Sequence, residues 1–350
     1  MASAAITAGQ ARPIVRSTRP RKQLATVTEP RLSVIIVNYI QWEATSRVVQ
    51  QVTRSAPCKA GEVEVVVVDN HSQPHPVAVS LRRRRGVSLR RWGQNRGFAR
   101  AVNEGSRLSR GDWLLLLNPD VTLPRGFLKG ALDLSERLAA EEPQAGIVGF
   151  HLRNPDGSLQ LSSGPFPTLA GTLAGLMLPR ARRKYRAIHS RRRCRVPWVT
   201  GCCLLVRRDC FRQLGGFDEN FFLYYEDVDL CLRARERGWS VWYEPSLHAV
   251  HHRPLHSRAV PPHLRVVTRH ALLTYGGKHW PEWQFRLLAG IIYAEAWLRG
   301  RWASRQGEAV SAAHFNELQT IAREMVAGSP AAARRSLARV LRHEERLLAR

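Results

Sequence analysis

Short runs of β-branched residues and leucines, each ending in polar residues, limit the possible folds of this chain more than any other feature. The first four runs cover residues 33–37, 63–68, 87–89 and 113–117. Between them, residues 43–54 and 99–109 carry apolar residues at helical spacing. Apolar runs of this length are typical of strands buried on both faces. Their alternation with helices predicts an α/β fold, an open sheet flanked by helices.

The pattern changes after residue 146. Further strands are predicted at 146–150, 198–206 and 241–243, with a helix at 226–237. From about residue 263 onward the sequence indicates helices. Three parts are therefore expected: a flexible basic N-terminal tail at 1–30, a sheet domain at 31–256 with a basic loop at about 165–195, and a C-terminal helical extension at 257–350.

Positive charge is the extreme feature of the composition. The 350 residues include 54 Lys+Arg against 28 Asp+Glu, a formal net charge of +26. Such a charge indicates a polyanionic partner: nucleic acid, an anionic membrane or a phosphorylated substrate. Between Arg180 and Arg195 there are nine basic residues and no acid, which favours a solvated loop or a membrane-facing one equally. Nucleic-acid binding is disfavoured because Tyr185 is the only aromatic residue between Arg180 and Arg195, whereas such surfaces interleave aromatic and basic residues.

The cysteines and the apolar stretches indicate where in the cell the protein is expected to work. Six cysteines occur without a CxxC pair, which indicates small core residues in a reducing compartment. The most apolar stretch, Leu287 to Leu298, is only about twelve residues long and contains Glu295, so it predicts a buried or interfacial helix. Residues 1–30 lack an apolar core and are predicted to be a tail, with a transit peptide as the alternative. A cytoplasmic protein, peripheral on the inner face of the plasma membrane, is expected.

Polar side chains end several predicted strands. Asn38 and Tyr39 follow the first, Asp69 ends the second, and Asn118 and Asp120 follow the fourth. Ligands of open parallel sheets bind outside these carboxyl ends. The Asp120 carboxylate, with the amide of Asn118, is suited to Mg²⁺ or Mn²⁺ that takes its other ligands from phosphates and water; the alternative is an ordinary Asn-Pro-Asp turn. Asp69 is suited to a nucleobase or ribose, or to capping a helix.

Three further segments carry candidate chemistry. Residues 95–98 begin a helix whose free N–H groups could donate hydrogen bonds to a phosphate. The alternative is that Gly97 only relieves a constraint on the backbone conformation. Glu226 and Asp227 lie in the first turn of another helix, where a carboxylate either caps the helix or acts as a general base. Asp229 is predicted to form a surface pair with Arg233 four residues later. One histidine of His248, His251 and His252 is a candidate metal ligand.

These segments together resemble family 2 glycosyltransferases of GT-A fold, and the match is closest to the rhamnosyltransferase-like branch. The matching blocks are 33–39 (SVIIVNY), 67–72 (VVDNHS), 95–105 (NRGFARAVNEG), 116–120 (LLNPD), 198–201 (WVTG), 216–219 (GFDE) and 225–233 (YEDVDLCLR). They occur in the family's order and cover about residues 32–256. The resemblance implies a GT-A sheet domain, Rossmann-like and mixed, followed by the helical extension.

The resemblance also implies roles for individual residues. Asp69 would bind the nucleoside, and Asp120 with His251 would hold Mg²⁺ or Mn²⁺ on the diphosphate. Asp227, with Glu226 beside it, would be the base that deprotonates the acceptor. The acceptor side would include Asp218 and Glu219, and the donor side would also include Asn38, Tyr39, Asn95, Phe98 and Asn118. Two departures stand out: Asn118 replaces the first Asp of a DxD pair, and the sequence after His252 leaves the choice between His251 and His252 open.

The expected function is therefore a metal-dependent, inverting transfer of a sugar from a nucleotide-sugar to a glycan or lipid-linked glycan. A nucleotidyltransferase on a similar fold is one alternative, but it would favour a basic, Gly-rich phosphate loop after the first strand, where this chain has Asn38 and Tyr39. A nucleic-acid-binding protein is the alternative from another class. An inactive scaffold is disfavoured by the presence of both Asp120 and Asp227.

Overall fold

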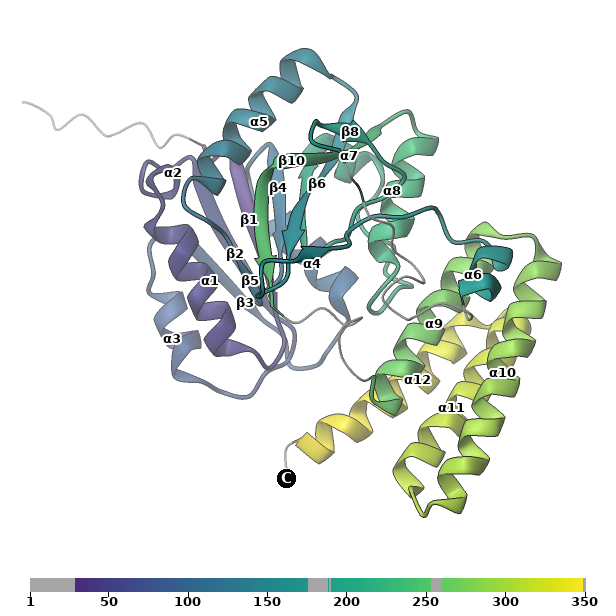
Figure 1. Cartoon of the computed structure of the whole chain (residues 1–350). Helices are drawn as coiled ribbons and strands as arrows, with labels where there is room; N and C mark the ends of the chain where they lie inside the picture. The colour runs from purple at the N-terminus through teal and green to yellow at the C-terminus, as the bar shows by residue number, and fades with distance from the viewer. Residues whose placement is uncertain (1–28, 176–187, 189, 253–259, 349–350) are drawn as a thin grey trace, which may run out of the picture.

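A computed structural model describes residues 29–175, 188, 190–252 and 260–348 (Figure 1). The predicted tail, part of the basic loop and the boundary near residue 256 therefore lie outside the described residues. The sheet has the strand order β3-β2-β1-β4-β9-β6-β10-β5, with β7 added beside β6 and β8 beside β10. The prediction of an open mixed sheet flanked by helices and followed by C-terminal helices is confirmed.

The bounds of the elements are as follows. The strands are β1 (Leu32–Asn38), β2 (Val63–Asp69), β3 (Val87–Arg91), β4 (Trp113–Leu117), β5 (Val121–Thr122), β6 (Ala145–Arg153), β7 (Leu159–Gln160), β8 (Cys194–Arg195), β9 (Cys203–Arg207) and β10 (Ser240–His251). The helices are α1 (Trp42–Arg54), α2 (Ala56–Lys59), α3 (Pro76–Arg82), α4 (Phe98–Leu108), α5 (Phe127–Glu141), α6 (Leu169–Gly175), α7 (Arg208–Gln213), α8 (Glu226–Glu236), α9 (Pro262–His279), α10 (Glu282–Arg305), α11 (Ala309–Val326) and α12 (Pro330–Leu348).

The central strand β1 explains the architecture. All seven of its residues are buried because helices cover both faces of the sheet. Val34 and Ile36 pack into the hydrophobic cluster that includes α1 and α5, whereas Ile35 and Val37 pack into the cluster that includes α4 and α8. Strand side chains alternate between faces, so the four apolar residues at 34–37 are what the middle of such a strand requires.

The direction of the strands brings the predicted site residues to one edge. β1 pairs in parallel with β2 and with β4, and Asn38 lies directly opposite Asp69. β9 runs antiparallel between β4 and β6, and β10 pairs in parallel with β6. Near its end β10 also pairs with β5, which places His251 opposite Val121, the residue after Asp120. The carboxyl ends of β1, β2, β4 and β10 therefore lie along one edge.

The strand predicted at 198–206 is wrong at its start. β9 begins at Cys203, and the preceding residues form a turn in which Val199 makes one isolated bridge to Ser163. The Cys202 carbonyl accepts a hydrogen bond from the Asn118 N–H at 2.9 Å, and the Gly201 N–H is bonded to a side chain. The apolar residues at 198 and 199 are buried in the core without belonging to a named strand of the sheet.

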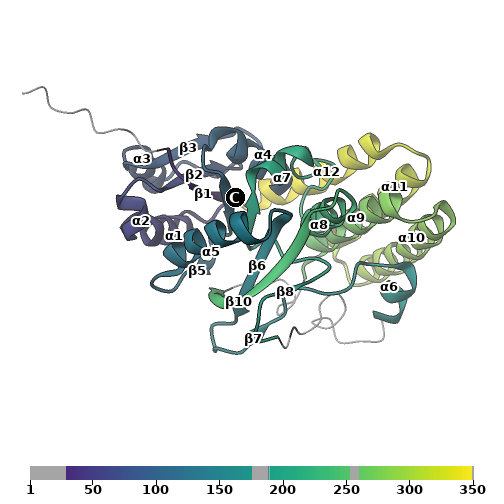
Figure 2. The same ribbon diagram turned by 90° about the horizontal axis from the view of Figure 1, so that it is seen from above.

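The C-terminal helices α9–α12 form a bundle beside the sheet domain, as Figures 1 and 2 show. Their core is a separate hydrophobic cluster that includes Val267, Leu288, Phe315, Leu318 and Leu337. Among the described helices, none combines the length and the apolar character needed to cross a bilayer.

The cysteines behave as small core residues. All six are free, and Cys202, Cys203, Cys210 and Cys231 are buried. Burial raises the pKa of Cys210 to about 12, so this thiol stays protonated at neutral pH.

Candidate active site

A buried hydrogen-bond network joins the carboxyl ends of β1, β2 and β3. The Asn38 amide donates to Asp69 Oδ1 at 2.8 Å, and Arg91 Nε donates to Asp69 Oδ2 at 2.8 Å. Arg91 also donates to the Ser72 carbonyl at 2.9 Å, and its guanidinium lies 5.4 Å from the centre of the Trp42 ring. The network fixes the arginine at the edge of the sheet.

Asp69 is fully buried, and both of its carboxylate oxygens are occupied. It does not cap the next helix, since His75 is the N-cap residue of α3. Sequence reasoning placed Asp69 at this edge but missed Arg91, whose only signal was its position at the end of the third strand. The arginine side chain is partly exposed, so Arg91 rather than Asp69 can reach a ligand.

The N–H groups of residues 96–98, which lead into α4, are already bonded, whereas no side chain caps the first turn of the helix. The Arg96 N–H donates to Asn70, the Gly97 N–H donates to the Asn95 side chain, and the Phe98 N–H donates to the Phe222 carbonyl at 2.7 Å. The loop packs so closely that a Cβ added at Gly97 would lie 2.7 Å from that carbonyl oxygen. Gly97 has a φ of +92°, so glycine is required here for both backbone conformation and space.

Asp120 and His251 come together at the other end of the edge. His251 Nε2 lies 3.4 Å from Asp120 Oδ1, and the Gln160 amide lies 2.8 Å from His251 Nδ1. Cys202 also contacts His251. His252 points elsewhere, with Nε2 2.7 Å from Thr122 Oγ1. Of the two histidines, His251 is therefore the one beside the Asp120 carboxylate.

The environment of His251 favours its charged form. Burial alone would lower the pKa of this imidazole, but the neighbouring Cys202 and Asp120 side chains raise it to about 10. A metal ion binding at this histidine must therefore displace a proton.

Asp227 is held beside this pair by the turn that precedes β9. Its Oδ2 accepts a hydrogen bond from the Gly201 N–H at 3.0 Å, and its Oδ1 accepts one from the Val228 N–H at 2.9 Å. Since Gly201 is bonded to Asp227 and the next residue, Cys202, contacts His251, two adjacent residues connect the predicted base to the predicted metal ligands. No sequence signal identified this role of residues 201–202.

The backbone before α8 is in an unusual conformation. Tyr224 and Tyr225 have φ values of +73° and +66°, which side-chain-bearing residues rarely adopt. Each such residue costs about 1–3 kcal/mol and is found where surrounding structure enforces it, often at functional sites. The conformation places Glu226 and Asp227, both buried, in the first turn of α8.

Asp229 is not the surface residue that was predicted. Its pair with Arg233 exists, at 2.7 Å, but the carboxylate is fully buried. Two residues at the end of α9 cover it: Lys278 Nζ and His279 Nε2 each lie 2.8 Å from Asp229 Oδ1. Burial alone would raise the pKa of this carboxyl, but the hydrogen bond from His279 and the charges of Arg233 and Lys278 lower it below its usual value.

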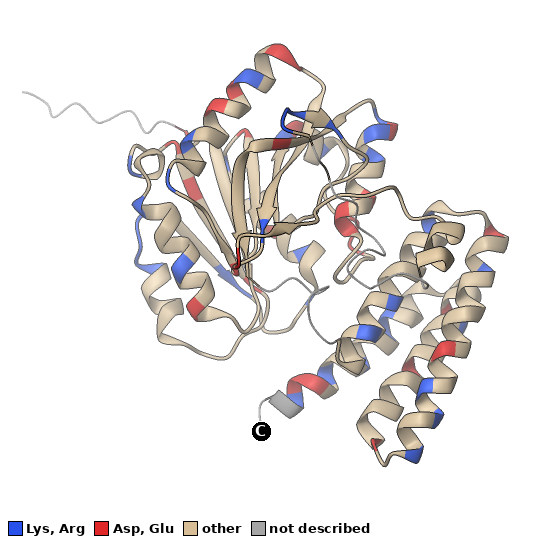
Figure 3. Ribbon diagram, viewed as in Figure 1, with Lys and Arg blue, Asp and Glu red and all other residues tan. Residues whose placement is uncertain are grey.

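Asp218 and Glu219, predicted on the acceptor side, also meet the extension. Lys278 Nζ lies 2.6 Å from Asp218 Oδ2, so one lysine joins Asp218 to Asp229. The Arg334 side chain donates to the Glu219 carbonyl at 2.9 Å, and the Glu219 carboxylate pairs with Arg100. Figure 3 shows the acidic first turn of α8 between the sheet and the helices of the extension.

Tyr39, predicted on the donor side, contacts the extension as well. The Tyr39 hydroxyl donates to Glu345 at 3.2 Å. Burial and the charge of Glu345 raise the pKa of Tyr39 to about 12, so the phenol remains a hydrogen-bond donor at physiological pH.

The residues at the Asp120 end fit a divalent ion that is completed by its substrate. Within the described ranges, no three residues of His, Cys, Asp and Glu are arranged to hold a metal by themselves. Asp120 and His251 supply one carboxylate and one imidazole, which leaves most positions to phosphate oxygens and water. Mg²⁺ and Mn²⁺ are commonly bound in this way at diphosphate sites.

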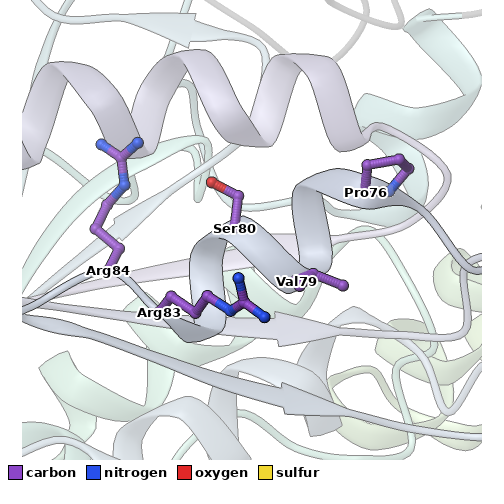
Figure 4. Close-up of a pocket in the computed structure, with 5 residues that line it drawn as sticks. All are labelled: Pro76, Val79, Ser80, Arg83 and Arg84. Carbon is purple, nitrogen blue, oxygen red and sulfur yellow. The ribbon is translucent and has the colours of Figure 1, made fainter.

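A surface hollow of about 500 Å³ lies elsewhere, beside α3 (Figure 4). It is lined by Pro76, Val79, Ser80, Arg83 and Arg84, and none of the residues expected at the site contributes to it.

Comparison with known proteins agrees with these observations. Residues 33–215 match the model of glycosyl transferase family 2. The chain is 35% identical over 228 residues to the N-acetylglucosaminyl-diphospho-decaprenol L-rhamnosyltransferase of Mycobacterium tuberculosis, covering 59% of this chain and 72% of that protein. It is 31% identical over 186 residues to rhamnosyltransferase WbbL of Escherichia coli, covering 51% of this chain and 69% of that protein.

One solved structure supports the fold. GalNAc-T7, determined with UDP, GalNAc and Mn²⁺, superposes with a TM-score of 0.51 at 17% identity. The superposition covers 70% of this chain but 48% of that one, so this chain spans about half of the larger protein. The similarity concerns the sheet architecture.

Proposed function

The chain belongs to glycosyl transferase family 2 and is a rhamnosyltransferase-like glycosyltransferase, and from this premise we propose a specific reaction. It is a metal-dependent, inverting transfer of a sugar, with rhamnose as the first candidate, from a nucleotide-sugar to a lipid-linked glycan. The names of the rhamnosyltransferase relatives support the sugar and the acceptor class. The Mn²⁺ and UDP bound to GalNAc-T7 support a nucleotide donor and a divalent ion.

The observation that carries the proposal is the contact between the two halves of the site through Gly201 and Cys202. Asp227 is bonded to the first of these residues, and His251 contacts the second and lies 3.4 Å from Asp120. The base removes the proton of the acceptor, and the metal-binding pair holds the diphosphate of the donor. The two must therefore lie close together for the acceptor oxygen to reach the sugar.

In the proposed reaction, Asp227 accepts the proton of the acceptor hydroxyl. The acceptor oxygen then forms a bond to the anomeric carbon of the sugar as the bond from that carbon to the diphosphate oxygen breaks, which inverts the configuration. A divalent ion at Asp120 and His251 would offset the negative charge that develops on the leaving diphosphate. The nucleoside diphosphate leaves with both electrons of the broken bond.

The network at β1–β3 is proposed to hold the nucleoside. Asp69 and Asn38 are both fully buried, so they act by fixing Arg91, whose partly exposed side chain lies at the edge where a base or ribose would bind. Tyr39, Asn95, Phe98 and Asn118 are proposed to border the same donor. Glu226 is proposed to support Asp227, and Asp218 and Glu219 to position the acceptor.

The location follows from the acceptor. A lipid-linked glycan is held in a bilayer, so we propose that the chain works at the inner face of the plasma membrane. The formal charge of +26 supports attraction to anionic lipids.

Replacing the base tests the proposed reaction. We expect Asp227→Asn to lower kcat by about 100-fold or more in a transfer assay with a nucleotide-sugar panel and a diphospholipid-linked acceptor, because a positioned base contributes about 10²–10⁴-fold. The matched control is Asp209→Asn, which changes an exposed carboxylate on α7. Full activity of Asp227→Asn would remove the base assignment.

A further inference from the structure

The helix α10 is apolar on two opposite sides. One side carries Phe285, Leu288, Ile292 and Ala296, which are buried against the rest of the bundle. The opposite side carries the tryptophan face, which we define as Trp283, Leu287, Trp297, Leu298 and Trp302; these residues are between 44% and 64% exposed. An amphipathic helix on the surface of a soluble bundle would be expected to turn polar residues to this side.

The exposed apolar residues are concentrated on this helix. Of eleven large hydrophobic residues exposed in the described part of the chain, five belong to the tryptophan face, including all three exposed tryptophans. Along a helix axis, Trp283 and Trp302 lie about 28 Å apart at 1.5 Å per residue. Gly290 and Ala294, between the two ends, add no bulk to the face. Contiguous exposed apolar surfaces of this kind mark contact sites.

Arginines accompany the tryptophan face. The guanidinium of Arg301 lies 5.0 Å from the centre of the Trp297 ring. The two acids of α10 are already paired: Glu282 with Arg286, and Glu295 with Arg269 and Arg299. Within the described ranges neither Arg301 nor Arg305 pairs with a carboxylate. The C-terminal half of the face therefore presents apolar rings together with unneutralised positive charge.

The position of α10 relates this face to the acceptor side. Figures 1 and 2 both show α10 at the outer edge of the extension, on the side away from the sheet. Its N-terminal end, with Trp283, follows α9 directly, and Lys278 near the end of α9 contacts Asp218 and Asp229. The N-terminal end of the tryptophan face is thus connected through α9 to the lysine that contacts Asp218.

We propose that the tryptophan face of α10 seats this protein on a bilayer rich in anionic lipids. Tryptophan is favoured at the level of the lipid headgroups, because its ring is apolar and its N–H is polar. Arg301 and Arg305 would meet phosphate groups at the same level. The proposal rests on the proposed lipid-linked acceptor, and it assigns the partner that brings such an acceptor to Asp218 and Lys278.

The test measures co-sedimentation with vesicles of phosphatidylcholine alone and of equal parts phosphatidylcholine and phosphatidylglycerol. We expect the full-length protein to bind the anionic vesicles and to lose binding by about tenfold or more in a Trp283→Gln, Trp297→Gln, Trp302→Gln variant, because binding scales with the apolar area inserted. The matched control is Val79→Gln, Leu108→Gln, Leu159→Gln, which removes three exposed apolar residues outside α10.

A second variant keeps the test decisive if the first one folds poorly. Arg301→Gln, Arg305→Gln is expected to weaken binding to anionic vesicles by about fivefold for each arginine, whereas Arg90→Gln, Arg212→Gln, which removes two other exposed arginines, is expected to have a smaller effect. Thermal melting of each variant checks that it is folded.

The remaining outcomes contradict the proposal. Equal binding by the wild type and both α10 variants, or no binding to anionic vesicles, overturns it. A dimer in solution that is lost in the tryptophan variant, without vesicle binding, would assign the face to a second copy of the chain. The vesicle assay contains neither donor nor acceptor, so it can fail while the transfer assay succeeds, and the reverse.

Discussion

The sheet domain and the helical extension differ in how much of their contribution to the site can be predicted from sequence. The sheet domain places its polar residues at the ends of apolar strands, so the edge where they meet follows from the pattern. The extension, α9–α12, has no such motif, yet Lys278 contacts Asp218 and Arg334 contacts Glu219, the two residues proposed for the acceptor side. In the proposed site the donor is thus bound at the strand ends, whereas the proposed acceptor side is shared between the two regions.

The buried charge of Asp229 gives the sharpest way to break this comparison. If the extension is fastened to the site by this carboxylate, Asp229→Asn should lower the free energy of unfolding by about 3–5 kcal/mol, because it leaves Arg233 and Lys278 without a buried partner. Chemical denaturation measures the loss. Asp209→Asn is the control, and its loss should be below about 1 kcal/mol, since exposed pairs contribute little.

The stability that the Asp229 carboxylate contributes should also depend on pH. The folded-state pKa of Asp229 is below its usual value, so its contribution is present above the unfolded pKa of about 4 and is lost as pH falls through the folded pKa. The difference in stability between wild type and Asp229→Asn should therefore shrink below about pH 4. A difference that stays constant over this range would contradict the charge assignment.

Metal binding should depend on pH at the other end of the site. With the pKa of His251 raised to about 10, binding of Mn²⁺ releases a proton, so affinity should rise by about tenfold per pH unit from neutrality toward that value. Without metal, the stability contributed by the charged imidazole is full below about pH 6.5 and is lost as pH rises through about 10. Titration calorimetry at several pH values measures the affinity.

Two variants separate the histidines in that experiment. His251→Gln should weaken Mn²⁺ binding and remove its pH dependence, while His252→Gln, which alters a side chain bonded to Thr122, should leave both unchanged. The opposite result would transfer the metal role to His252.

Lys278 tests whether the extension contributes to the acceptor side. Lys278→Met removes the charge shared by Asp218 and Asp229, so the acceptor KM should rise by about tenfold, in line with a hydrogen bond between charged groups. Donor affinity should not change. A rise in donor KM alone would place the lysine on the wrong side of the site.

The smallest expected effect concerns the contact between Tyr39 and Glu345 on α12. Tyr39→Phe removes the hydrogen bond to Glu345 and should cost about 1 kcal/mol of stability. Thermal melting detects this change. A loss several times larger would show that α12 depends on this contact far more than one hydrogen bond explains.

The sequence predicted the parts of the fold that depend on local pattern. The strands ending at Asn38, Asp69 and Leu117 were predicted correctly because a strand buried on both faces is a nearly continuous run of Val, Ile and Leu. The burial of Asp229 was missed because its partners on α9 lie about fifty positions later in the chain. The role of the turn at Gly201 was missed because the contact is made by a backbone N–H, which nearly every residue type carries.

The central claim is that one edge of the sheet binds a nucleoside diphosphate through a divalent ion at Asp120, with Asp227 next to it as the base. Thermal shift with UDP, GDP and dTDP, each with and without Mn²⁺, tests it most directly. At least one nucleotide should raise the Tm of wild type and of Asp227→Asn only when Mn²⁺ is present, and Asp120→Asn should lose that rise. A full Mn²⁺-dependent rise in Asp120→Asn, or none in the wild type with any of the three nucleotides, would contradict the claim.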